Sequence, residues 1–162
     1  MPASLAQETA RHARDSATGL GDDYRDLSAR MCWDAAASCV VRAGGATPRP
    51  GTITADRFGD YVRLTDPIVG DADAMRKVPQ GTLLGFVELR NGTPTLVHAM
   101  VATGHGLAAG NKNDCVGVGK SVGWEILDLA GGLKWIDGAK AISAPSPLSP
   151  GGRRLTVYAR EL

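Results

Sequence analysis

The chain has 162 residues, a formal net charge of +1, 43% hydrophobic residues and 22% charged residues. This length suits one domain, and this composition supplies a buried core and excludes a disordered chain. The Lys and Arg residues are scattered, and no apolar run approaches the roughly 20 residues that span a bilayer. We therefore expect no nucleic acid and no membrane among the partners.

Cysteine usage and the N-terminus bear on the cellular compartment. Three cysteines are too few, and odd in number, for a disulfide framework, so at least one thiol is expected to be free. Residues 1–18 carry several charges and no apolar segment, which does not fit a Sec signal peptide. We expect a protein that is cytoplasmic in the producing cell or is secreted without a cleaved signal peptide.

The N-terminal part of the chain predicts helices. Residues 3–17 repeat apolar side chains at helical spacing. Residues 33–41 do so more strongly, with a stripe of five apolar side chains: Trp33, Ala36, Ala37, Val40 and Val41. Gly44-Gly45 predicts the end of this helix, and Asp22 or Asp23 predicts the start of a shorter helix before it.

The middle of the chain predicts loops around one short helix. Residues 46–52 contain two prolines and a glycine, and residues 66–80 contain two prolines, one glycine and three aspartates. Both segments are therefore expected to be mostly irregular. Between them, Thr54 is expected to cap a short helix that runs through Phe58 and Tyr61.

From Gly81 onward the pattern predicts strands. Four β-rich runs are separated by turn signals and predict an antiparallel meander: residues 82–89, 95–103, 107–111 and 122–127. A loop rich in Pro, Ser and Gly at 144–152 precedes a last predicted strand at 154–160. This order, helices first and an antiparallel sheet second, predicts an α+β fold.

Cys32 has the position that a nucleophilic cysteine requires. A cysteine hydrolase needs a thiolate beside an imidazole that a third group orients. Cys32 opens the strongest predicted helix, whose N-terminus favours the thiolate and offers N–H groups to an oxyanion. The alternative is a packed, inert thiol, and Cys39 and Cys115 fit that alternative better than Cys32 does.

His98 is the matching candidate for the base. It lies in an otherwise apolar strand, where an imidazole needs a partner because burying it unpaired costs free energy. A lone histidine in such a strand is more often a satisfied core residue. A suitably placed cysteine, Cys32, favours the catalytic interpretation.

The group that orients His98 is expected on the next strand. Depending on which two residues form the hairpin turn, either Asn111 or Asn113 lies opposite His98. Lys112 and Asp114 would then face the other side, unless a bulge shifts the register. Asn113 and Asn111 are therefore the candidates, with Asp114 as the alternative.

Residues 97–106, followed by Lys112-Asn113, resemble the histidine-and-asparagine part of papain-like cysteine peptidases. Cys32-Trp33 at the start of a helix resembles their nucleophile, and residues 79–86 resemble the smaller bacterial cell-wall peptidases of that superfamily. The resemblance implies a papain-like core with N-terminal helices packed on a C-terminal antiparallel sheet. In it, Cys32 attacks a carbonyl and His98 relays the proton.

The resemblance also implies a single domain over residues 1–162, in which residues 1–45 supply the nucleophile and residues 81–162 the histidine. Two features depart from the family. Asp26 stands where these enzymes usually have a glutamine, and an ionised carboxylate cannot donate to an oxyanion. The Gly-Ser that precedes the cysteine in many relatives is replaced by residues 29–31. The oxyanion hole is therefore expected to consist of the Cys32 backbone N–H and a second donor that the sequence does not identify.

The activity that the resemblance implies is cleavage of an amide or peptide bond through a Cys32 thioester, without a cofactor or metal. A compact chain with no pro-segment, signal peptide or disulfides resembles bacterial toxin-type effectors. We therefore expect an amidase or peptidase acting on a peptide, a protein or peptidoglycan, and allow for an inhibitory or immunity protein. The alternatives are a protein glutamine deamidase on the same fold and a papain-like binding or structural domain without activity.

Two other patterns do not support a site. Gly119-Lys120-Ser121 lacks the upstream glycine of a phosphate-binding loop, because Asp114 occupies that position. The cysteines and histidines lack the paired spacing of zinc ligands.

Overall fold

The computed structural model describes residues 3–20, 24–46, 53–63, 71–136, 141–146 and 149–162. Its helices are α1 (Leu5–Thr18), α2 (Tyr24–Ala29), α3 (Cys32–Arg42), α4 (Ala55–Val62), α5 (Ala72–Arg76), α6 (Leu129–Gly132) and the short 3-10 helix η1 (Asn113–Val116). Its strands are β1 (Leu83–Arg90), β2 (Thr93–Gly104), β3 (Leu107–Asn111), β4 (Trp124–Asp128), β5 (Lys134–Ile136), β6 (Ala141–Ser146) and β7 (Ser149–Arg160).

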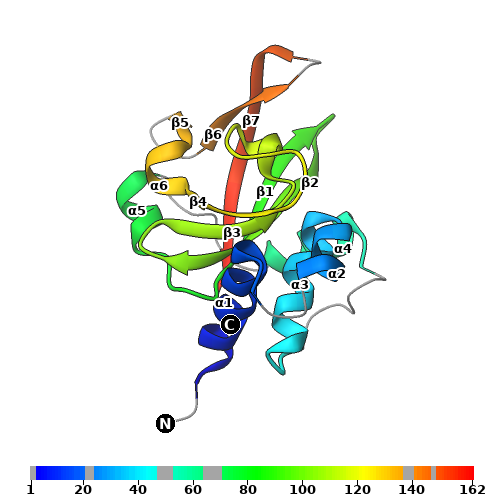
Figure 1. Ribbon diagram of the computed structural model, residues 1–162. Coiled ribbons are helices and arrows are strands. Elements are labelled where there is room, and N and C mark those ends of the chain that lie inside the picture. Colours follow the sequence, from blue (N-terminus) through cyan, green and yellow to red (C-terminus); the bar gives the residue numbers. More distant parts are fainter. Residues whose placement is uncertain (1–2, 21–23, 47–52, 64–70, 137–140, 147–148) are drawn as a thin grey trace.

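The described strands form one curled antiparallel sheet in the order β4-β3-β2-β1-β7-β6-β5 (Figure 1). β1 to β4 are the meander that the sequence predicts, with each strand paired to the next. β7 pairs with the other edge of β1 and continues past it to pair with β6. The α+β expectation is thus confirmed for the described residues.

The sheet has an apolar core on each face. Side chains alternate along a strand, so Leu83 and Val101 face one side while Leu84 and Met100 face the other. The first side is covered by α1, α3 and α4, and the second by α5, α6 and the β6–β7 hairpin (Figure 1). Because burial of one such side chain stabilises the fold by about 2 kcal/mol, both layers hold the sheet in place.

Helix α3 begins at Cys32 because the preceding residue, Met31, is extended, with φ −66° and ψ 155°. The helix packs Ala36, Ala37 and Val40 into the core, as the apolar spacing predicts. Val41, however, is 40% exposed, so its place in the predicted stripe was wrong. Instead, every residue from 35 to 40 is buried. Most of these side chains are small, so this part of the helix packs closely against α1 and the sheet.

Other local expectations had mixed outcomes. The helix predicted after Thr54 is confirmed as α4, and the Thr54 side chain accepts from the N–H of Arg57. Residues 72–76 were expected to be irregular but form α5, which Asp71 caps by accepting from the N–H of Ala74 at 2.7 Å. The predicted cap at Asp22 or Asp23 lies outside the described residues.

The loop predicted at 144–152 was also wrong for its described residues. Residues 141–146 form β6, and β7 already begins at Ser149, so the two strands make a hairpin with Ser146 opposite Ser149. Pairing between strands therefore overrides the loop-like composition, since strand formation depends on neighbours more than on local preference.

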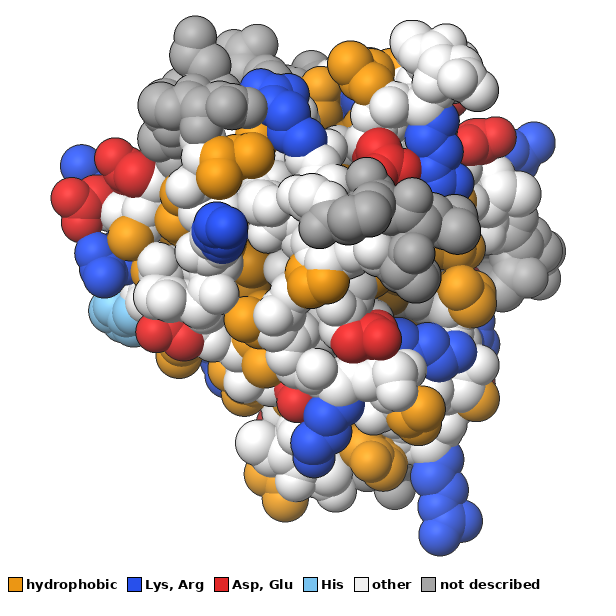
Figure 2. Space-filling view, turned by 90° about the horizontal axis from the view of Figure 1, so that it is seen from above, with side chains coloured by type: hydrophobic (Ala, Val, Ile, Leu, Met, Phe, Trp, Pro, Cys, Tyr) orange, Lys and Arg blue, Asp and Glu red, His pale blue; other side chains and the backbone are white. Residues whose placement is uncertain are grey.

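The surface mixes charges of both signs. Figure 2 shows Lys and Arg, Asp and Glu, and hydrophobic side chains interspersed on the face seen from above. Such a distribution gives that face no single-sign field. None of the helices in the described ranges combines the length and the apolar character required to cross a bilayer.

Candidate active site

Cys32 lies at the first position of α3, with its side chain 5% exposed. Burial raises the pKa of the Cys32 thiol to about 11. Three backbone N–H groups act in the opposite direction by donating towards the sulfur, those of Ala99, Trp33 and Cys32 itself, and so does the charge of Lys112. The sulfur is therefore a neutral thiol at pH 7, in surroundings that already hold donors for a negative charge.

His98 lies in the middle of β2 and is completely buried. It is opposite Phe86 on β1, with the two ring centroids 5.7 Å apart. Its Nε2 lies 2.9 Å from the side-chain oxygen Oδ1 of Asn113. Burial lowers the pKa of His98 to about 4, and the hydrogen bond with Asn113 opposes that shift. The imidazole is therefore neutral at pH 7.

The contacts of Asn113 fix which ring nitrogen of His98 carries the proton. The Asn113 amide nitrogen Nδ2 donates to the carbonyl of Gly110 at 2.9 Å and to the Glu125 carboxylate at 3.3 Å. Its Oδ1 is thereby turned towards His98, and because an oxygen of this kind only accepts, Nε2 is the protonated nitrogen. Nδ1 then has a free lone pair, and it has no hydrogen-bond partner among the described residues. The Cys32 thiol is not a hydrogen-bond partner of this nitrogen: His98 faces the side of the sheet shared by Phe86 and Met100, whereas α3, which carries Cys32, covers the other side.

Asn113 reaches His98 by a route that the sequence did not predict. A bulge near the end of β2 shifts the β2–β3 register by one residue, so a continued ladder would place Lys112 opposite His98. Instead, β3 ends at Asn111, and Lys112 takes a left-handed conformation with φ 59° and ψ 61°. This turn starts η1, which carries Asn113 back to the imidazole. The predicted strand pairing was wrong, whereas the predicted residue is the one that meets His98.

Asn111 is not placed to orient His98. Its buried Nδ2 donates to the carbonyls of Leu27 at 3.1 Å, Ser28 at 3.1 Å and Arg30 at 2.7 Å. These carbonyls belong to the segment that leads into α3, so Asn111 ties that segment to the sheet. Asp114, the other alternative, is exposed.

Asp26 is part of an ion-pair cluster beside α3. It accepts from Arg42 and from Arg30. The hydrogen bond from Arg42, followed by that from Arg30, holds the pKa of Asp26 below its ordinary value. The carboxylate is therefore ionised at pH 7 and cannot donate a hydrogen bond.

Cys115 lies next to the same stretch of β2 as Cys32. Its sulfur is 3.7 Å from the carbonyl oxygen of Val97, while the sulfur of Cys32 meets the N–H of Ala99. The two cysteines therefore flank the backbone of His98. Burial, followed by the charge of Cys32, raises the pKa of Cys115 to about 12.

Two residues at the site were not predicted, Lys112 and Glu125. Lys112 was expected to face away, but the strand ends before it, and its charge acts on Cys32. Glu125 reaches the site because it is paired with Gly110 across β3 and β4. No local signal in the sequence marks Glu125, since only the strand pairing brings it to Asn113.

Comparison with protein-family models, with curated proteins and with solved structures gave no match. The function of the site is therefore inferred from its own geometry. In the described part of the chain, no three His, Cys, Asp or Glu side chains are grouped so that they could hold a metal ion.

Proposed function

We propose that the chain is a cysteine hydrolase with a papain-like core, in which Cys32 attacks an amide or peptide carbonyl and His98 acts as the base. The observation that carries this proposal is the buried His98–Asn113 pair, with 2.9 Å between Nε2 and Oδ1. The lone pair of Nδ1 is left without a hydrogen-bond partner, and the Cys32 sulfur meets the backbone N–H of Ala99, so the reaction requires the thiol to approach this nitrogen.

In the proposed reaction both partners start uncharged, because the pKa of Cys32 is about 11 and that of His98 about 4. Nδ1 accepts the thiol proton as the sulfur attacks the carbonyl carbon, so the ion pair forms during attack. The N–H of Cys32 at the helix N-terminus donates to the oxyanion. The imidazolium then protonates the leaving amine, which leaves a thioester on Cys32.

Hydrolysis of the thioester completes the cycle. Nδ1 takes a proton from water, the resulting hydroxide attacks the thioester carbonyl, and the proton returns to the sulfur as the acid leaves. Asn113 accepts from Nε2–H in both protonation states of His98, so it positions the ring without taking a proton. The charge of Lys112 favours the negative charge that develops near the sulfur.

The substrate class that we favour is the amide or peptide bond of peptidoglycan or of a target protein, as for bacterial effectors. The test is incubation of the protein with peptidoglycan sacculi and, separately, with a host-cell lysate, both analysed by mass spectrometry. Release of muropeptides indicates an amidase, new peptide ends indicate a peptidase, and conversion of glutamine to glutamate indicates the deamidase alternative.

The chain offers a matched control for this test, because Cys32 and Cys39 are both buried on α3. The wild-type protein and Cys39→Ala are expected to form the product, and Cys32→Ala is not. A product that persists in Cys32→Ala, or no product in any of the assays with the wild-type protein, contradicts the proposal.

One observation favours a second candidate, a binding or structural domain without activity. Cys32 is 5% exposed and its pKa is raised rather than lowered, which are features of an inert thiol. This candidate predicts that Cys32 reacts equally fast with and without the His98 imidazole, whereas the enzyme proposal predicts a slower reaction without it. A small acylating reagent measures this difference in rate.

A further inference from the structure

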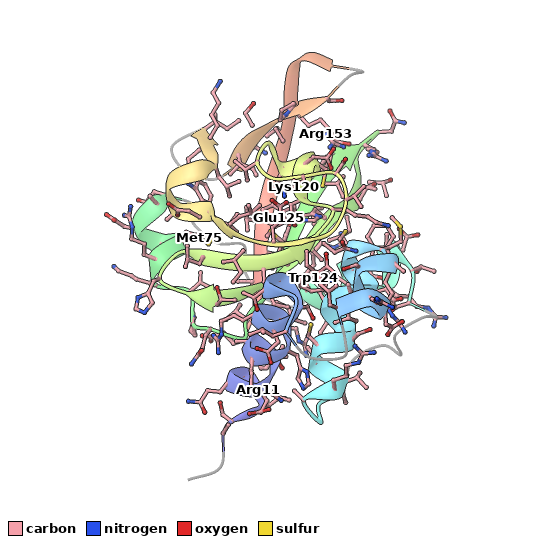
Figure 3. The ribbon with its side chains drawn as sticks, viewed as in Figure 1. Arg11, Met75, Lys120, Trp124, Glu125 and Arg153 are labelled. Atoms are coloured by element: carbon pink, nitrogen blue, oxygen red, sulfur yellow. The ribbon has the colours of Figure 1, made fainter. Side chains whose placement is uncertain are left out.

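Glu125 is joined to the His98–Asn113 pair by hydrogen bonds. Its carboxylate oxygen Oε1 lies 3.3 Å from Nδ2 of Asn113 and accepts from the backbone N–H of Lys120 at 2.6 Å. Figure 3 shows Lys120 and Glu125 close together near the centre of the view. The interactions therefore run in a chain from Glu125 through Asn113 to His98.

Two glycines make room for this chain. A Cβ atom at Gly110 would lie 2.6 Å from Oδ1 of Asn113. A Cβ atom at Gly119 would lie 2.8 Å from Oε1 of Glu125 and 2.9 Å from Cβ of Asn113, and Gly119 also has a φ of +86°. The loop before β4 and the strand β3 therefore approach Asn113 and Glu125 more closely than any side chain allows.

The chemistry of Glu125 selects one orientation of the Asn113 amide. A carboxylate accepts hydrogen bonds and cannot donate them, so it attracts Nδ2 and repels Oδ1. If the amide were turned over, Oδ1 would face Glu125 and the carbonyl of Gly110, and Nδ2 would face His98. Nε2 would then have to be the acceptor, and the proton would move to Nδ1, where it would block the base.

We propose that Glu125 is a positioning residue for His98: it holds the Asn113 amide with Oδ1 towards the imidazole, which keeps the proton on Nε2 and the lone pair on Nδ1. Its consequence for catalysis rests on the proposed function, whereas its effect on the His98 tautomer does not. The alternative is a purely structural role, in which Glu125 only anchors the loop through the N–H of Lys120 and the carbonyl of Gly110 alone orients Asn113.

The test is the tautomer of His98, observed by NMR of the ¹⁵N-labelled imidazole at pH 7. The wild-type protein is expected to show one protonated and one unprotonated ring nitrogen. In Glu125→Ala the two ¹⁵N signals should move towards each other, because both tautomers become populated. Glu125→Gln should restore the wild-type pattern, since its side-chain oxygen still accepts from Asn113. Asp114→Ala, which removes an exposed carboxylate next to Asn113, is the matched control and should change nothing.

A wild-type pattern in Glu125→Ala overturns the proposal, because Gly110 alone would then suffice. If Glu125→Ala does not fold, as judged by circular dichroism, Glu125→Met fills a similar volume without an acceptor and gives the same reading. Where turnover is found, kcat should fall about tenfold or more in the variant without an acceptor, with KM unchanged, and recover in Glu125→Gln.

The two proposals can fail separately. If the wild-type protein has no activity, the ¹⁵N signals still decide the role of Glu125. If the tautomer shifts in Glu125→Ala while a Cys32-dependent turnover stays unchanged, His98 is not the base, and the proposed mechanism fails although Glu125 does orient Asn113.

Discussion

Acidification should destabilise the protein through His98. Burial lowers the pKa of His98 to about 4 in the folded chain, from an ordinary value of 6.5. Between these values the unfolded chain binds a proton that the folded chain does not, so the free energy of unfolding falls as the pH drops from 6.5 towards 4. Because one pKa unit corresponds to about 1.4 kcal/mol, the loss at pH 4 is about 3 kcal/mol. Above pH 6.5 this contribution to stability is fully present.

Urea denaturation followed by tryptophan fluorescence measures this effect at a series of pH values from 7 to 4. The reference is His98→Gln, which does not titrate in this range but keeps every other acidic and basic group. The free energy of unfolding of the wild-type protein should fall by about 3 kcal/mol more than that of His98→Gln over this range. Parallel profiles of the two proteins would show that His98 is not held neutral, and the buried pair with Asn113 would be wrong.

Iodoacetamide should alkylate Cys32 slowly at pH 7, with a rate that rises about tenfold per pH unit towards pH 10, because only the thiolate reacts and burial raises the thiol pKa to about 11. Peptide mapping by mass spectrometry gives this rate, and rapid alkylation at pH 7 would refute the raised pKa. Lys112→Met should move the same profile to higher pH, since the charge of Lys112 lowers that pKa, and Lys112→Arg should leave it in place. Asn111→Ala should lower the free energy of unfolding by about 3 kcal/mol in urea, because three carbonyls lose their donor, while exposed Asp114→Ala should change it by less than about 0.5 kcal/mol. Equal effects of these two variants would contradict the anchoring role of Asn111.

Several parts of the fold that local sequence determines were predicted, although the short helix α5 was not. Helix α3 was predicted from its apolar spacing, and its end from the glycines that follow it. Both signals lie within the helix or directly beside it. The meander follows from β-rich runs and turn glycines. The β6–β7 hairpin was missed because its stability comes from pairing, β7 being shared between β6 and β1.

The candidate site shows the same limit at the level of single residues. Asn113 was a correct candidate for the partner of His98, but its route through a left-handed Lys112 could not be predicted, because non-glycine residues rarely adopt that conformation. The role of Asn111 depends on the distant segment that leads into α3. The role of Glu125 depends on the pairing of β4 with β3. Such contacts exist only once the sheet has formed.

The most direct measurement of the central claim is acylation by p-nitrophenyl acetate at pH 7, with acid quenching and peptide mapping. The small ester needs no knowledge of the natural substrate, and attack on it forms the proposed thioester at Cys32. We expect an acetyl group on Cys32 in the wild-type protein and in Cys39→Ala, and its loss in His98→Gln. Acetylation of Cys32 that continues at the wild-type rate in His98→Gln, or that falls equally on Cys39 and Cys115, would contradict the assignment of His98 as the base of a Cys32 nucleophile.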